Sequence, residues 1–276
     1  MSGLRHIKKW IATVPVLLWS SSSFAAVQGE AGIGFPRDVS VDGERIDWLL
    51  NVTNGFALLL FIIMCVWMAI CILKHNKNHT PDYDYGTSKH SVYTAITVSV
   101  LIFFVVDGNL FYNSVIDVNE IFWNYKAAET EDTVRIEVNA RQWAWSIRYP
   151  GPDNMFNTKD DIVTLNDMRV PVNKPISLQL GAVDVIHSFF LPNLRIKNDA
   201  VPGMINKLWF QAKETGEFDI ACTQHCGTYH YKMKGKLTIL EQADYDAWYK
   251  EAQINSERDY DDTDAQAHWG WKWREM

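Results

Sequence analysis

The residues best suited to chemistry lie in one short stretch of the C-terminal half. Two cysteines, one histidine and one methionine stand between Cys222 and Met233, in the order Cys-x3-Cys-x3-His-x2-Met. Thiolate, thioether and imidazole groups are soft ligands, which select copper or zinc over hard cations. The methionine favours copper, because protein zinc sites use Cys, His and carboxylate ligands. This stretch therefore predicts a transition-metal site.

The two cysteines indicate how many metal ions the site could hold. Blue-copper sites place one cysteine beside His and Met on a β-domain. Cys222 and Cys226, a short loop apart, can instead bridge two copper ions, and each copper then needs its own histidine. His230 supplies one histidine. His187, in a predicted strand outside the loop, is the natural second.

Three other interpretations of the cluster remain open from the residues alone. The two cysteines could form a disulfide, which an oxidising compartment permits. They could hold a structural zinc ion with His187, His225 or His230. The methionine and histidine could also be ordinary packing residues. Met233 favours copper over zinc, and we expect the disulfide to form when copper is absent, so that loading requires a reduced pair.

The cluster must be positioned by a β-rich domain. From residue 133 onward, short runs rich in Val, Ile, Phe and Trp alternate with turn signals such as Pro150-Gly151-Pro152. Many short strands at this spacing predict an antiparallel sandwich or barrel. A terminal helix is expected over residues 243–254. The predicted strands cover residues 134–139, 143–148, 176–180, 185–191, 207–212, 217–221 and 236–240.

Two apolar segments precede this domain. Residues 48–73 carry no charge, and residues 56–73 have no strongly polar side chain. At ~1.5 Å per residue, such a helix spans the ~30 Å hydrocarbon core of a bilayer. Residues 91–116 are apolar apart from Asp107 and small polar residues. An ionisable group inside a membrane helix is a functional candidate by default, but we favour a position of Asp107 at the membrane interface, because Gly108-Asn109 weakens the segment and the helix emerges near this point. A transmembrane hairpin is predicted over a buried soluble helix pair, because the first segment is apolar on every face.

The N-terminus and the loop charges predict the orientation. Residues 1–25 have a basic start, a short apolar run and small residues before a cut after Ala25, as in a secretory signal. An uncleaved anchor is the alternative, which Pro15 disfavours. The loop at about residues 75–89 is basic and both flanks are acidic, so the loop should be cytoplasmic. We expect a two-pass protein of the bacterial cytoplasmic (inner) membrane, with its N-terminus and C-terminal domain on the periplasmic side.

The expected fold class is an α+β membrane protein, in which a two-helix hairpin precedes an all-β domain. Its parts are a signal peptide (1–25), an exported segment (26–47), a hairpin (48–116) with helices at about 48–74 and 90–112, a β-domain (117–255) and a C-terminal tail (256–276). The net charge of −7 argues against a nucleic-acid partner. Residues 241–264 hold nine Asp or Glu against Lys250 and Arg258. Such a run usually forms solvated surface, but it can also steer a basic partner.

Four local motifs carry a resemblance to a known family. They are Gln142-Trp-Ala-Trp-Ser146, Asp184-Val-Ile-His-Ser188, Lys197-Asn-Asp-Ala-Val-Pro-Gly203 and the Cys222–Met233 stretch. With the helical hairpin, they make the chain resemble subunit II of the haem–copper oxidases, the cytochrome c oxidase subunit that carries the dinuclear CuA centre. The resemblance covers nearly the whole mature chain.

The resemblance implies a cupredoxin-like Greek-key domain and a role for each site residue. Trp143 matches the family's aromatic residue through which electrons enter from cytochrome c, whereas Trp145 is expected to be a core residue. The implied copper ligands are bridging Cys222 and Cys226, one histidine per copper from His187 and His230, and weakly bound Met233 and the backbone carbonyl of Gln224.

The resemblance also implies a function. The subunit would take electrons from cytochrome c or another periplasmic donor and pass them to the haem and copper centres of subunit I, where oxygen is reduced to water. It would do no bond-breaking chemistry itself, and its partners would be subunit I, subunit III and membrane lipid. Alternatives are a membrane-tethered copper-binding or assembly protein without an oxidase partner, and the CuA domain of nitrous oxide reductase. A two-helix anchor disfavours the latter.

One departure from the family affects a second metal. The family usually has Glu at the position of Gln224, and that carboxylate helps hold a magnesium ion at the interface with subunit I. A neutral amide is a poorer ligand for a hard cation. Asp199 remains as a candidate ligand. Because Gln224 replaces the usual Glu, however, the sequence does not preserve the full magnesium site.

Overall fold

The computed structural model describes residues 36–273 except 76–78, 81–82 and 84. The predicted signal peptide, residues 1–25, and the first part of the exported segment, residues 26–35, lie outside the described residues. The chain divides into two compact units. One is helical and comprises Asp42–Ala127, and the other contains both β-sheets together with residues 36–41.

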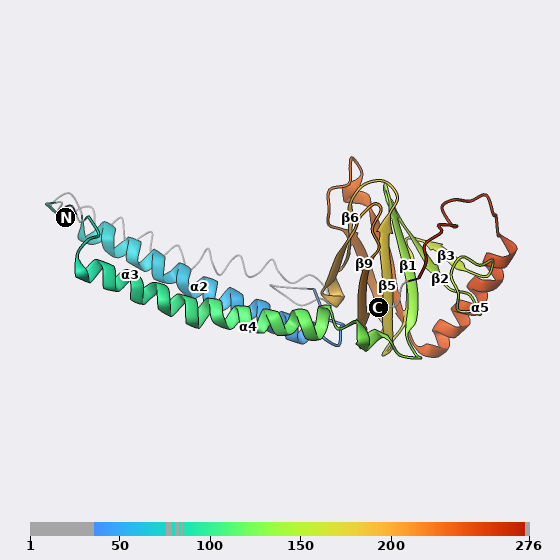
Figure 1. Cartoon of the computed structure of the whole chain (residues 1–276), viewed down its shortest axis with the longest axis horizontal. Coiled ribbons are helices and arrows are strands. Elements are labelled where there is room, and N and C mark those ends of the chain that lie inside the picture. Colours follow the sequence, from blue (N-terminus) through green and yellow to red (C-terminus); the bar gives the residue numbers. More distant parts are fainter. Residues whose placement is uncertain (1–35, 76–78, 81–82, 84, 274–276) are drawn as a thin grey trace, which may run out of the picture. The chain divides into compact units, whose positions relative to one another are not determined.

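The helical unit contains two long helices that run side by side (Figure 1). The first is α2 (Gly43–Lys74). The second consists of α3 (Lys89–Ile102), a π-helical turn (Phe103–Asp107), α4 (Gly108–Asp117) and a second π-helical turn (Val118–Phe122). Both are long and apolar enough to cross a membrane, and their most apolar windows are not buried within the chain. Apolar side chains exposed on every face require lipid or partner helices to cover them.

The helices are longer than the sequence predicts. The second was expected to end at about residue 112 and to leave the membrane near Gly108, but helical turns continue to Phe122, so Asp107 lies within a continuous helix. The π-helical turn before Gly108 accommodates this weak point without ending the helix. The first begins at Gly43 rather than about residue 48. Its polar first turn is held to the second helix, because Arg45 donates to Asp117 at 2.8 Å and to Asn113 at 2.7 Å.

The β unit is a sandwich of two five-stranded sheets with strand orders β3-β2-β1-β5-β8 and β4-β10-β9-β6-β7. Alternate residues of each strand point into a shared apolar core, as Ile136 and Val138 of β1 do. The strands are β1 (Val134–Arg141), β2 (Ala144–Tyr149), β3 (Ile162–Leu165), β4 (Asp167–Pro171), β5 (Pro175–Ala182), β6 (His187–Leu191), β7 (Ile196–Ala200), β8 (Asn206–Gln211), β9 (Gly216–Cys222) and β10 (Lys234–Leu240).

The sandwich differs from the predicted antiparallel one in two respects. The pairs β1–β5 and β10–β4 are parallel. Strands β3, β4 and β7 were not predicted, and each of the three lies at the edge of a sheet. Short or polar edge strands carry little apolar alternation, because one side of their backbone pairs with no other strand. In addition, β6 begins at His187 rather than residue 185, which leaves Val185 and Ile186 in a loop.

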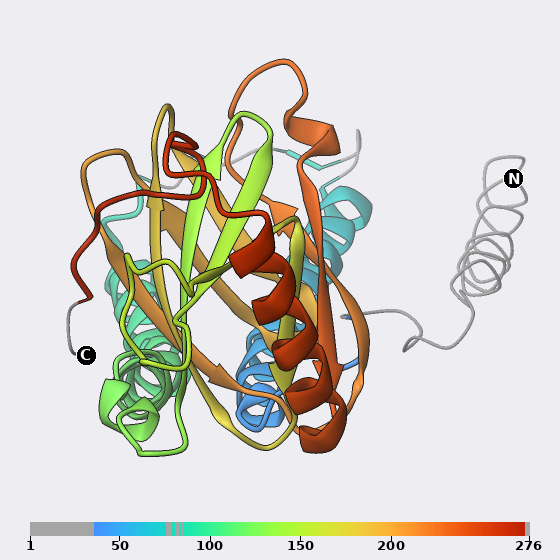
Figure 2. The ribbon, with the colours of Figure 1, turned by 90° about the vertical axis from the view of Figure 1, so that its right-hand side faces the viewer.

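The end of the chain packs on the β unit. Helix α5 (Gln242–Arg258) is longer than the predicted 243–254, and Tyr245 is its buried residue. The C-terminal arm (residues 259–273) follows and crosses the face of a sheet (Figure 2). Trp269 of the arm is only 6% exposed. The predicted tail, residues 256–276, is therefore in large part attached to the domain.

Candidate metal centre

Three loops meet at one end of the β unit and, together with the strand ends that flank them, carry the predicted site residues. They are the β1–β2 turn, the loop before β6 and the loop between β9 and β10 (Figure 2). The backbone N–H of Val183 donates to the carbonyl of Ala140 at 3.1 Å. Gln142 donates its backbone N–H to Asp184 Oδ2 at 2.7 Å and its side-chain amide to the carbonyl of Cys226 at 2.8 Å. These bonds hold the three loops in fixed relation.

The side-chain donor atoms of the five predicted ligands converge between these loops. The sulfur atoms of Cys222 and Cys226 are 3.8 Å apart. His187 Nδ1 lies 4.0 Å from the Cys222 sulfur, and His230 Nδ1 lies 3.5 Å from the Cys226 sulfur. Met233 Sδ lies 3.1 Å from His187 Nδ1 and 3.7 Å from the Cys226 sulfur. Each cysteine thus has its own histidine beside it.

The remaining predicted ligand and the burial of the set agree with this arrangement. The carbonyl oxygen of Gln224 lies 3.3 Å from the Cys222 sulfur, while its side chain is exposed. His187, Met233 and Cys226 are almost fully buried. Both cysteines are free thiols in this structure, with their sulfur atoms well beyond the ~2.05 Å of a disulfide bond. The ligand atoms of His187, Cys222 and Cys226 lie within 4.8 Å of one another, which is close enough to hold one metal ion.

The environment separates the two thiols. Burial acts to raise the pKa of Cys222, but hydrogen bonds from His187 and from backbone groups outweigh it and lower that pKa to about 6. Burial and the neighbouring Cys222 raise the pKa of Cys226 to about 12. Burial also opposes protonation of His187, yet its hydrogen bonds to Cys222 and Asp184 raise the pKa of the imidazole. The pair can thus hold one negative charge before a metal displaces the second proton.

Asp184 orients the buried histidine. Its Oδ1 lies 2.9 Å from His187 Nε2 and also accepts the backbone N–H of Val185 at 2.7 Å. Because Nε2 faces the carboxylate, Nδ1 is directed at the sulfur atoms. Carboxylates commonly fix metal-binding histidines in this way. The sequence motif contained Asp184, but it gave no reason to assign it this role, whose only local signal is the three-residue spacing from His187.

The two tryptophans of the Gln-Trp-Ala-Trp motif lie in different environments. Trp143 is half-buried, its indole N–H donates to the carbonyl of Cys226 at 3.3 Å, and its ring makes an edge contact with Tyr229, with ring centres 4.8 Å apart. Trp145 is fully buried and packs against Phe189, as expected for a core residue. Trp143 is therefore the one that links the metal-ligand loop to the surface.

Comparisons with known proteins identify the family. Residues 121–239 match the family model for the periplasmic domain of cytochrome c oxidase subunit II. The alternative cytochrome c oxidase subunit 2 of Bradyrhizobium diazoefficiens is 27% identical over 234 residues, with 76% of this chain and 81% of the relative covered. Cytochrome c oxidase subunit 2 of Cereibacter sphaeroides is 26% identical over 257 residues, with 80% of each chain covered.

One solved structure adds to these relatives. The periplasmic domain of subunit II of the cytochrome oxidase of Bradyrhizobium japonicum is 31% identical, and the match covers 44% of this chain and 94% of that domain with a TM-score of 0.40. The segment that matches the family model contains every predicted ligand position. The match to this family implies that the domain binds copper. The two apolar helices fit a membrane protein with a periplasmic domain. The chain belongs to the cytochrome c oxidase subunit II family and is a subunit of an oxidoreductase complex.

Proposed function

We propose that this chain is the electron-transfer subunit of a respiratory terminal oxidase. It accepts single electrons from cytochrome c or an equivalent periplasmic donor at a dinuclear copper centre. It passes them to the haem and copper centres of subunit I, where oxygen is reduced to water. The membership of the chain in the subunit II family supports this role over that of a free copper-binding or assembly protein.

The observation that carries the proposal is the convergence of donor atoms between the three loops. Two sulfur atoms 3.8 Å apart, each beside its own imidazole, provide two halves of a site. The thioether of Met233 and the carbonyl of Gln224 supply one further weak donor each. This set of thiolate, imidazole and thioether groups fits copper, and a second cysteine distinguishes it from a single-copper site.

The scaffold suits electron transfer because it limits rearrangement. When bound, two thiolate-bridged coppers would share one electron, so that the change in charge is spread over many bonds. The ligands come from the beginning of β6, the end of β9 and the loop that leads into β10. Rigid strands hold such groups more closely than free loops do. The Asp184 carboxylate fixes the orientation of His187, and the loop-to-loop hydrogen bonds hold Gln142 and Cys226 together.

The same proposal gives Trp143 the role of electron entry. Its half-buried ring reaches from the surface to the backbone of Cys226. The helical hairpin anchors the protein in the inner membrane as a two-pass unit, with the loop at about residues 75–89 in the cytoplasm and the copper domain in the periplasm. Subunit I, and also subunit III, are its partners in the membrane.

The proposal is tested by metal analysis and electron paramagnetic resonance of the purified full-length protein. We expect two coppers per chain and one unpaired electron shared between them. One zinc ion with no paramagnetic signal would contradict the proposal. A mononuclear copper signal would also contradict it, because the second cysteine and histidine would then have no role.

The role of Trp143 is tested by Trp143→Ala. We expect slower reduction by the electron donor with unchanged copper content, because the side chain donates only to a backbone carbonyl of the ligand loop. Trp248→Ala, on α5, serves as the control and should leave the rate of reduction unchanged. Loss of copper in the Trp143 variant would show instead that this tryptophan is structural.

A further inference from the structure

Large apolar side chains are exposed around the metal-ligand loops. Val183 is 63% exposed, Ile186 45%, Met204 58% and Tyr229 48%. Together with the half-buried Trp143, these residues form what we call the apolar rim. Exposed apolar patches of this kind mark interaction sites on soluble domains. Aromatic residues and Met are also enriched where proteins recognise one another.

Hydrogen bonds and ring contacts bring these residues to one place. Tyr229 makes an edge contact with the ring of Trp143. The β1–β2 turn that carries Trp143 is bonded to the loop that carries Val183 and Ile186. A bridge between Ala182 and Pro202 joins that loop to the one that carries Met204. The rim therefore lies directly beside the donor atoms of the candidate copper site.

The loops of the rim carry little negative charge. Residues 141–143, 183–186, 201–205 and 223–233, all of them described, contain one acidic residue, Asp184, against Arg141 and Lys232. The Asp184 carboxylate is already engaged with His187, Val185 and Gln142. A ring of acidic groups that could attract a strongly basic partner is thus absent from these loops.

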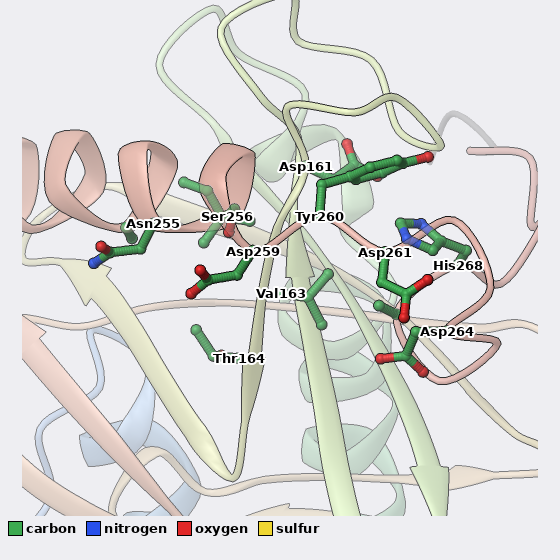
Figure 3. Close-up of a pocket in the computed structure, with 13 residues that line it drawn as sticks. Asp161, Val163, Thr164, Asn255, Ser256, Asp259, Tyr260, Asp261, Asp264 and His268 are labelled. Atoms are coloured by element: carbon green, nitrogen blue, oxygen red, sulfur yellow. The ribbon is translucent and has the colours of Figure 1, made fainter.

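One group of acidic side chains lies away from these loops. Asp161, Asp259, Asp261 and Asp264 line a cavity of about 410 Å³, to which residues 162–164 of β3, helix α5 and the C-terminal arm also contribute (Figure 3). Helix α5 is held near Pro150 at the end of β2, because the hydroxyl of Tyr249 donates to the Pro150 carbonyl. The β1–β2 turn with Trp143 lies at the other end of β2. The net charge of −7 therefore does not describe the surface around the copper ligands.

We propose that a soluble one-electron donor docks on the apolar rim through an apolar edge around its own redox group, with little electrostatic steering. The inference rests on the proposed function, because it names the class of partner for that same copper site. Redox partners bind through small, transient interfaces, so a few exposed side chains suffice. Charge complementarity mainly raises the association rate, and the rim offers little of it.

The experiment measures reduction of the copper centre in the purified oxidase complex by stopped flow. The probes are two reduced soluble cytochromes c, one strongly basic and one with a net charge near zero. For the near-neutral cytochrome we expect the second-order rate constant to change by less than about twofold between 20 and 200 mM salt. Exposed charges are largely screened beyond ~10 Å at 0.1 M, so a rate constant raised by charge attraction would fall over this range. The rate of the near-neutral cytochrome should be at least equal to that of the basic cytochrome at the higher salt concentration.

Val183→Glu is the variant that separates the two modes of docking. A charge placed in an apolar contact should slow the near-neutral cytochrome by about tenfold, equivalent to ~1.4 kcal/mol. Ile254→Glu on α5 is the matched control, because Ile254 is 65% exposed and lies outside the rim, and it should leave the rate unchanged. The backbone hydrogen bond of Val183 to Ala140 does not involve the substituted side chain, so the loop should retain its position.

Two results would overturn the docking proposal while leaving the copper function intact. In the first, only the basic cytochrome reduces the copper centre, its rate constant falls tenfold or more as salt is added, and Val183→Glu accelerates it. The other is a copper-loaded complex that neither cytochrome reduces. Copper content and light-driven electron transfer from copper to haem are measured in every sample. Their absence in the unaltered protein would contradict the proposed function itself.

Discussion

Two buried polar clusters of the β unit differ in which atoms face one another. In one, hydrogen-bond donors face acceptors, and in the other, metal-binding sulfur and nitrogen atoms converge. Under the C-terminal arm, Arg148 donates its Nε to Glu137 Oε2 at 3.1 Å and lies 3.6 Å from Asp161. The guanidinium also donates to the carbonyl of Trp269 at 2.8 Å, and its centre lies 4.1 Å from that indole ring. Trp269 in turn donates to Glu137 at 2.8 Å. At the metal end, by contrast, sulfur and nitrogen atoms face one another at 3.1–4.0 Å.

The difference shows how a structural cluster can be told from a ligand-binding one. The cluster under the arm pairs opposite charges and supplies donors for acceptors, as buried ionic groups require. The cluster between the loops gathers lone pairs with few protons to share, because thioether, thiolate and imidazole are all acceptors or metal ligands. A cation would balance the second cluster. In the first, the charges are already paired within the chain, and Glu137 Oε1 is the one carboxylate oxygen of that residue without a hydrogen-bond partner.

The largest expected effect comes from removing a bridging ligand. Cys226→Ser replaces the soft, central sulfur by a hard oxygen, and we expect complete loss of the shared-electron signal in electron paramagnetic resonance together with loss of at least one copper per chain. Cys65→Ser, in the first helix, is the control and should change neither quantity. Two coppers with an unaltered signal in the Cys226 variant would show that this cysteine is not a bridge.

The second effect comes from the cluster under the arm. Arg148→Met removes a fully buried cation and leaves Glu137 and Asp161 without it, which should lower the free energy of unfolding by about 3–5 kcal/mol. Unfolding in urea, followed by tryptophan fluorescence, measures the change. Arg258→Met, on the exposed surface, should produce no measurable change. The copper content of the folded fraction should stay the same, and copper loss at full stability would contradict the separation of the two clusters.

The two clusters also differ in how far the sequence predicts them. Four of the five ligands with side-chain donors fall within the Cys222–Met233 stretch, so their spacing alone predicts a shared site. His187 lies far from this stretch in the sequence, and the prediction of it rests on its place near the end of the predicted strand 185–191, within the motif Asp184-Val-Ile-His-Ser188. Ligand type and short spacing are local properties, and they therefore survive in a sequence without knowledge of the fold.

The cluster under the arm has no such local signal. Glu137 and Trp269 are 132 positions apart in the sequence. Glu137 is also a polar residue in a strand where polar and apolar residues alternate, and this pattern predicts that the polar side chains face solvent. Because the tail is rich in Asp, the sequence predicts that it is solvated. In the structure, Trp269 of the arm packs over Arg148 on the outer face of the sheet, and both side chains are buried. Edge strands such as β7, with the sequence Ile-Lys-Asn-Asp-Ala, were missed for a related reason. Their pairing depends on a neighbour that the local pattern does not reveal.

A third, smaller effect concerns the support of a ligand rather than the ligand itself. Asp184→Asn weakens the acceptor that orients His187 and should lower copper affinity by about 10–100-fold, as loss of such supporting groups does elsewhere. Competition with a copper chelator measures the affinity. Asp199→Asn, an exposed acid on β7, is the matched control and should leave the affinity unchanged. Equal affinity in both variants would mean that packing alone holds His187.

The smallest effect tests the end of the domain that lies away from the proposed copper ligands. The Tyr249 hydroxyl donates to the carbonyl of Pro150, and Tyr249→Phe should lower the free energy of unfolding by about 0.5–1.5 kcal/mol. Burial, with nearby acidic groups, raises the pKa of Tyr249 to about 12. The unfolded chain begins to lose this proton near pH 10 and the folded one only near pH 12, so the contribution is complete below pH 10 and is lost as the pH rises between them. Unfolding in urea at pH 8 and at pH 11 should therefore show a smaller difference between Tyr249→Phe and the unaltered protein at the higher pH. A difference that grows with pH would show that the hydroxyl ionises more readily in the folded protein, contrary to the raised pKa that burial and the nearby acidic groups give it.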